Sequence, residues 1–105
     1  MKSQPIKVLI VDDQSIVRKG IKAFLGEYED ISLVGEADNG LEAVKLTEEL
    51  KPDVVLLDLL MPGMDGIETI NRICAVQPNQ RIIVLTAYFK DDEILQALAE
   101  GASAY

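Results

Sequence analysis

Four short apolar runs, separated by segments with helical periodicity, are the feature of this sequence that most restricts its fold. In three of the four runs the apolar residues follow one another without alternation, as they do in strands covered on both faces of a parallel sheet. The segments between the runs carry apolar residues three and four positions apart, which is typical of amphipathic helices. The predicted strands are 8–11, Ile31–Ala37, 54–59 and 81–87, and the predicted helices are 15–26, Gly40–Leu50, Gly66–Val76 and 91–100.

This order of elements predicts an α/β domain in which residues 103–105 open a fifth strand. Strands that alternate with helices form a parallel sheet with right-handed crossovers and with helices on both faces. A chain of 105 residues corresponds to one domain. In such sheets the ligand site lies beyond the carboxyl ends of the strands, where the strand order reverses. The residues at these ends are therefore the first candidates for a site.

The composition argues against several functions. A formal net charge of −8 disfavours direct nucleic-acid binding by this segment, since such domains are normally basic. The single cysteine, Cys74, excludes an internal disulfide, and its helix face, shared with Ile70 and Ile73, predicts a buried small hydrophobe. The sequence has neither a signal peptide nor an apolar stretch of membrane-spanning length. We therefore expect a cytoplasmic location and no membrane partner.

Acidic residues stand at the ends of two predicted strands. Asp12 and Asp13 follow the first strand, Asp58 lies near the end of the third, and Thr86 lies near the end of the fourth. Two carboxylates about 5 Å apart repel each other by roughly 3 kcal/mol at an effective dielectric constant near 20. A hard divalent cation removes this repulsion, and oxygen-only ligands favour magnesium, manganese or calcium over zinc. The pattern predicts a metal site.

Phosphoryl chemistry is the leading interpretation, because Mg²⁺ at oxygen-rich sites commonly shares phosphate oxygens. Asp58 is then the candidate nucleophile, becoming an aspartyl phosphate, while Asp12 and Asp13 hold the metal and Thr86 donates a hydrogen bond to a phosphoryl oxygen. Plainer readings stay open at this point: a polar strand-to-helix turn for the Asp pair, and an ordinary strand position for Thr86. Asp65 is read as a turn or cap residue. A glycine-rich phosphate loop followed by Lys-Ser/Thr is missing from the sequence.

Four motifs together give the sequence a family resemblance. In order and spacing, the chain resembles the receiver domain of bacterial two-component response regulators through VLIVDD, PDVVLLDLLMPGMDGIE, IIVLTA and ALAEGASAY. The similarity extends from Ile6 to Tyr105. Three stretches resemble the subgroup of transcription regulators with a LuxR-type helix-turn-helix, namely RKGIKAFL, DISLVGEADNG and EGASAY. The resemblance implies a flavodoxin-like, doubly wound five-stranded parallel sheet of order 2-1-3-4-5.

The resemblance also implies roles for individual residues. Asp58 would accept a phosphoryl group from a phosphohistidine on a sensor histidine kinase, as a switch and not as an enzyme acting on other substrates. Asp13 would bind Mg²⁺ directly and Asp12 mainly through metal-bound water, and the backbone carbonyl of Leu60 would complete the protein ligands. Manganese is the alternative ion.

The same resemblance implies how the signal leaves the domain. Thr86 would be the switch hydroxyl, and Tyr105 the aromatic residue that changes position with it. Phosphorylation would produce a homodimer, and DNA would be bound only through a C-terminal output domain outside this chain. In the family, the chain continues past the position of Tyr105 to a lysine that pairs with the phosphoryl group and to a fifth helix. We therefore expect residues 1–105 to be a receiver domain truncated at its C-terminal end.

Two alternative functions are weaker. A phosphatase with an aspartate nucleophile on a similar fold usually carries a second aspartate two residues after the first, whereas Leu59 and Leu60 follow Asp58 here. A receiver-like module that works by protein contact alone usually lacks an acidic residue of the site, whereas all three aspartates are present. The sequence favours a functional phosphoacceptor.

Overall fold

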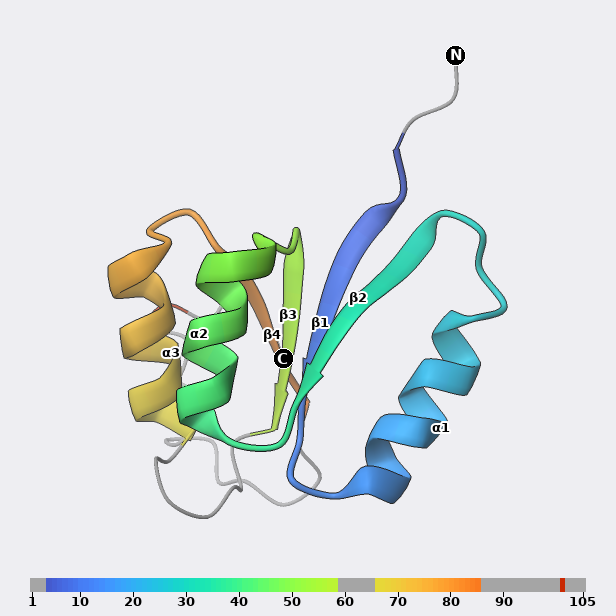
Figure 1. Cartoon of the computed structure of the whole chain (residues 1–105), viewed down its shortest axis with the longest axis horizontal. Coiled ribbons are helices and arrows are strands. Elements are labelled where there is room, and N and C mark those ends of the chain that lie inside the picture. Colours follow the sequence, from blue (N-terminus) through green and yellow to red (C-terminus); the bar gives the residue numbers. More distant parts are fainter. Residues whose placement is uncertain (1–3, 59–65, 86–100, 102–105) are drawn as a thin grey trace.

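A single parallel sheet separates one helix from two others in the computed structural model (Figure 1), which describes residues 4–58, 66–85 and 101. The sheet order is β2-β1-β3-β4, and every pair of neighbouring strands is parallel. The predicted order is therefore confirmed over these four strands, and the predicted fifth strand and the predicted helix 91–100 lie outside the described residues. The strands are β1 (Ile6–Val11), β2 (Ile31–Ala37), β3 (Val54–Asp58) and β4 (Arg81–Leu85), and the helices are α1 (Ser15–Leu25), α2 (Gly40–Leu50) and α3 (Gly66–Val76).

The helix boundaries follow local backbone chemistry. α2 begins where the side-chain oxygen of Asn39 accepts a hydrogen bond from the amide of Glu42 at 2.8 Å, as expected for an N-cap. It ends at Lys51, a left-handed residue with φ of 48°, directly before Pro52. α1 stops one residue before its predicted end, because Gly26 is its C-cap and donates to the carbonyl of Lys22 at 2.9 Å.

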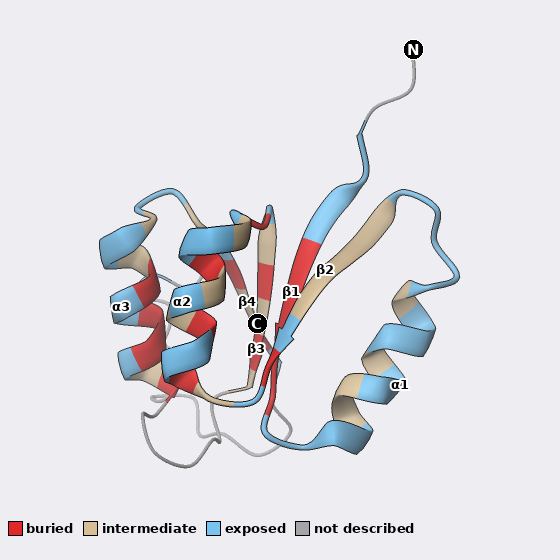
Figure 2. Cartoon of the chain, viewed as in Figure 1, coloured by how far each residue is buried: buried red, intermediate tan, exposed pale blue. Residues whose placement is uncertain are grey.

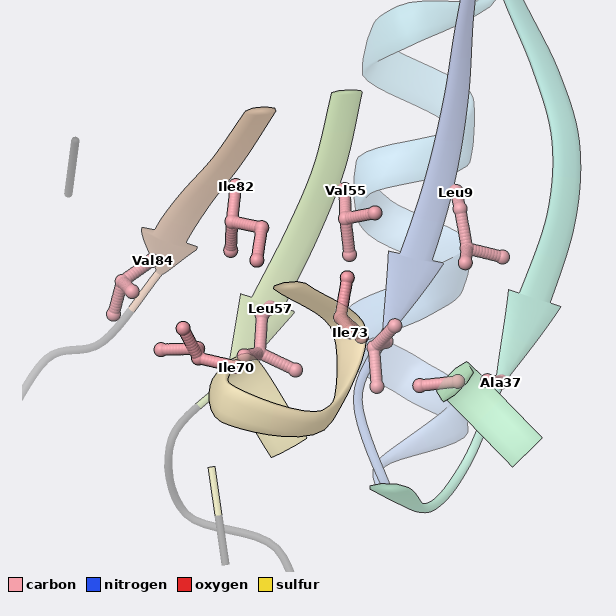
Figure 3. Close-up of a cluster of buried hydrophobic side chains, with 10 residues drawn as sticks. Leu9, Ala37, Val55, Leu57, Ile70, Ile73, Ile82 and Val84 are labelled. Carbon is pink, nitrogen blue, oxygen red and sulfur yellow. The ribbon is translucent and has the colours of Figure 1, made fainter. Parts of the chain in front are cut away.

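The main core lies between the sheet and the α2–α3 layer (Figure 2). Leu57, Ile70, Ile73 and Ile82 are fully inaccessible to solvent and meet there (Figure 3). Burying each such side chain contributes about 1.5–3 kcal/mol relative to leaving it exposed. Cys74 packs against the margin of this cluster, as expected of a small hydrophobe, but it is half-buried and not buried as predicted.

The opposite face of the sheet is less covered. Helical spacing predicts that Val17, Ile21, Phe24 and Leu25 share the apolar face of α1. Phe24 is exposed instead, and the other three are only half-buried. Ile16 and Phe24 on the same helix are 73% and 60% exposed. In the described ranges, no helix combines the length and the apolar character needed to cross a bilayer.

Candidate functional site

Three carboxylates meet at the carboxyl ends of β1 and β3. One side-chain oxygen from each of Asp12, Asp13 and Asp58 lies within 4.8 Å of the others, the one such group of potential metal ligands found among the described residues. Asp12 is buried, Asp58 is half-buried and Asp13 is exposed, so the cluster runs from the sheet edge to the surface. The predicted convergence of these residues is confirmed.

Strand register explains the convergence. β1 pairs with β2 on one side and with β3 on the other, which places the reversal of strand order beside β1. Val11 is aligned with Leu57 across the β1–β3 pair, so Asp12, just after β1, and Asp58, the last residue of β3, lie at the same level. Since ligands bind where the strand order reverses, the acidic group occupies the position expected of a binding site.

Asp12 is held by three separate hydrogen bonds. Its amide donates to the carbonyl of Ala37 at the end of β2, at 3.0 Å. Its carboxylate Oδ1 accepts from the amide of Gln14 at 2.9 Å, and its own carbonyl accepts from Nη1 of Arg18 at 2.6 Å. Hydrogen bonds from β2, from the turn itself and from α1 therefore hold the turn between β1 and α1.

The electrostatics of Asp12 suit a cation. Burial raises the pKa of this carboxyl, and the hydrogen bond from Gln14 opposes the rise. The neighbouring charge of Asp13 raises the pKa further, while the charge of Arg18 lowers it. A bound divalent ion would favour the ionised form of all three aspartates, and oxygen ligands are those that Mg²⁺ takes. The three side chains fit such an ion.

Sequence reasoning missed Arg18. Its Nε lies 3.2 Å from Oε1 of Glu36 on β2, and Nζ of Lys22 lies 3.9 Å from Oε2 of the same residue. A signal was available, since an arginine in the first turn of the helix that follows the Asp pair can point back at that pair. Glu36 had no such signal, because the contact between α1 and β2 depends on the tertiary structure.

Three other predicted site residues lie outside the described residues. They are Leu60, Thr86 and Tyr105, and Asp65 lies outside them too. The roles inferred for these residues stay predictions.

Comparison with known proteins identifies the family. Residues 8–105 match the response regulator receiver domain. The chain belongs to this family. A receiver domain is a signalling switch and not a classical enzyme, so the phosphatase alternative loses its support.

Individual relatives support the assignment to the receiver family. The uncharacterized transcriptional regulatory protein YhcZ of Bacillus subtilis is 48% identical over 100 residues, which are 95% of this chain and 47% of YhcZ. This chain thus spans about half the length of that relative.

Solved structures agree with this result. A LuxR-family two-component response regulator from Aurantimonas sp. has a TM-score of 0.92 and 33% identity, over 97% of this chain and 73% of that one. This match confirms the resemblance to LuxR-type regulators. A CheX–CheY–BeF₃–Mg²⁺ complex from Borrelia burgdorferi has a TM-score of 0.89 and 32% identity, over 95% of this chain and 75% of that one.

Proposed function

We propose that this receiver domain accepts a phosphoryl group on Asp58, and that Asp12 and Asp13 hold the Mg²⁺ ion that the reaction needs. The observation that carries the proposal is the meeting of the three carboxylate oxygens within 4.8 Å. Asp58 is the last residue of β3 and the one member of the group that a different strand contributes. The CheY complex, which contains Mg²⁺ and BeF₃ by its name, supports the same use of the site.

The two remaining aspartates have different tasks. Asp13 is exposed and can bind the ion directly. Asp12 is buried and already accepts a hydrogen bond from the amide of Gln14, so it contacts the ion through a water molecule. The carbonyl of Leu60 is the third protein ligand in this proposal, and Mn²⁺ can replace Mg²⁺ because both take oxygen ligands. When bound, the ion supplies positive charge that offsets the charge of the phosphoryl oxygens.

The chemical step uses Asp58 as nucleophile. A carboxylate oxygen forms the new bond to phosphorus, and the P–N bond of a phosphohistidine on a sensor histidine kinase breaks. The imidazole nitrogen keeps the electron pair and takes up a proton from water. Hydrolysis of the acyl phosphate by water later restores the carboxylate and releases inorganic phosphate.

The signal then passes to a larger assembly. Thr86 and Tyr105 change position together, and the phosphorylated domain forms a homodimer. DNA is bound by an output domain in a longer protein. In the relative YhcZ, about half of the chain lies outside the match, which is enough for such a domain. We place the receiver, its kinase partner and the regulated DNA in the cytoplasm, with no membrane contact by this domain.

Acetyl phosphate with Mg²⁺ tests the phosphoacceptor, with intact mass as the readout. The parent should gain one phosphoryl group, and Asp58→Asn should gain none. Asp53→Asn is the matched control, because Asp53 lies directly before β3 and accepts a hydrogen bond from the amide of Lys7. This control should be labelled like the parent.

Two results would contradict the proposal. Equal labelling of Asp58→Asn would place the acceptor elsewhere. A chain extended past the predicted fifth strand that stays unlabelled, with acetyl phosphate and with kinase alike, would favour the module that works by protein contact alone.

A further inference from the structure

We propose that Arg18 is a positioning residue for the metal site, because its guanidinium fixes the peptide that joins Asp12 to Asp13. This inference rests on the proposed function, since it concerns the same ion. Asp13 is the exposed member of the acidic group, so its carboxylate depends most on the backbone that carries it.

One guanidinium joins three elements. Nη1 donates to the carbonyl of Asp12 at 2.6 Å, and Nε donates to Oε1 of Glu36 at 3.2 Å. The side chain of Arg18 is 18% exposed, and its bond to Asp12 is partly shielded from water, whereas its bond to Glu36 is exposed. Because the guanidinium is a rigid planar fork, a bond at one nitrogen restricts the direction of the other. Glu36 on β2 therefore aims Arg18 of α1 at the end of β1.

The restrained carbonyl belongs to the peptide unit that ends at the nitrogen of Asp13. A peptide unit is planar, so holding the carbonyl oxygen also sets the amide of Asp13 and limits where its Cα can lie. The amide and carboxylate of Asp12 are held independently by Ala37 and Gln14. Arg18 thus restrains the step from the buried aspartate to the exposed one.

Charge and position make opposite predictions for Arg18. A cation beside three carboxylates repels a second cation, so the charge of Arg18 alone weakens Mg²⁺ binding. The orientation that it gives to Asp13 strengthens binding. If positioning dominates, removal of the side chain weakens the ion's binding, although it leaves the site more negative.

Lys22 provides the matched control. Within the described part of the chain it pairs with Glu36 at 3.9 Å and makes no bond to Asp12, and its side chain is 63% exposed. Lys22→Met therefore removes the same charge from the same helix and leaves the Asp12–Asp13 peptide untouched.

The experiment is a Mg²⁺ titration of the protein, followed through the backbone amide signals of Asp13 and Gln14 by nuclear magnetic resonance. Arg18→Met should raise the dissociation constant for Mg²⁺ by about tenfold or more, the usual cost of removing a group that orients a metal ligand. Lys22→Met should leave the constant unchanged or lower it. Without metal, the chemical shift of the amide nitrogen of Asp13 should change in Arg18→Met and should stay that of the parent in Lys22→Met.

Arg18→Lys keeps the charge but lacks the planar guanidinium, and it replaces Arg18→Met in the experiment if that variant does not fold. Its dissociation constant should also rise. A parent-like or lower constant in the folded arginine variant would overturn the inference.

Asp13→Asn separates the two proposals. If this variant loses Mg²⁺ binding and the arginine variants keep it, only the role of Arg18 is wrong. If the parent binds no Mg²⁺, or Asp13→Asn binds it normally, the proposed metal site falls and the inference falls with it.

Discussion

The sulfur of Cys74 occupies the space that a side chain at residue 101 would need. A Cβ built on Gly101 would lie 2.5 Å from Sγ of Cys74 and 3.6 Å from Cγ2 of Ile70. Gly101 also has a φ of 133°, a conformation that residues with a side chain rarely adopt. Glycine is therefore required at this position both by the backbone and by the neighbouring helix α3.

Gly101→Ala should destabilise the domain by about 1–3 kcal/mol, because the alanine meets backbone strain and a steric clash together. Urea denaturation measures the change. Gly20→Ala is the control, since a Cβ at Gly20, inside α1, would meet nothing within 4 Å. That variant should be more stable than the parent by about 0.5–1 kcal/mol.

The double variant Gly101→Ala/Cys74→Ala separates the two causes. It should be less destabilised than the sum of its single changes, because the smaller side chain at residue 74 relieves the clash. Strict additivity would show that the clash contributes little.

Asp12→Asn should stabilise the metal-free protein at pH 7. Burial and the charge of Asp13 raise the pKa of Asp12, so its ionised form costs folding free energy. The amide keeps an oxygen to accept the hydrogen bond from Gln14. The gain should be about 1–4 kcal/mol, the range for two like charges 4 Å apart between water and an effective dielectric constant near 20, measured by thermal unfolding in a chelator.

The pH dependence of this gain has a definite sign. A carboxyl whose pKa is higher in the folded protein destabilises above that pKa, and the penalty disappears as the pH falls below its ordinary value of 3.8. The difference between Asp12→Asn and the parent should therefore shrink as the pH falls from 7 to 3.5. A gain that persists at the lower pH would point to packing and not to charge.

Millimolar Mg²⁺ should raise the melting temperature of the parent, because an ion that binds only the folded state stabilises it. The effect is about 2.7 kcal/mol when free Mg²⁺ is one hundred times its dissociation constant. Asp13→Ala should lose most of this response and should be more stable than the parent without metal. Glu29→Ala removes an equal charge at an exposed position and should respond like the parent. A parent that does not respond would contradict the metal site.

The sequence determined the order of elements and the content of the acidic site. Apolar runs and helical spacing depend on local chemistry, so β2, α2 and α3 have the predicted bounds, whereas β1 begins two residues before its predicted start. The meeting of Asp12 with Asp58 followed from one rule, that the carboxyl ends of adjacent parallel strands share an edge. The N-cap at Asn39 was predictable for the same local reason.

Only the tertiary structure decided which distant groups support that site and that core. Arg18 and Glu36 are eighteen positions apart, and Cys74 and Gly101 are twenty-seven apart. The first contact depends on how α1 lies against β1 and β2, and the second on how residue 101 lies against α3. A helix can bury the same apolar stripe in many orientations. Periodicity therefore predicts the buried face but not the partner of each polar or small residue. Close packing and hydrogen bonding of the folded chain select that partner.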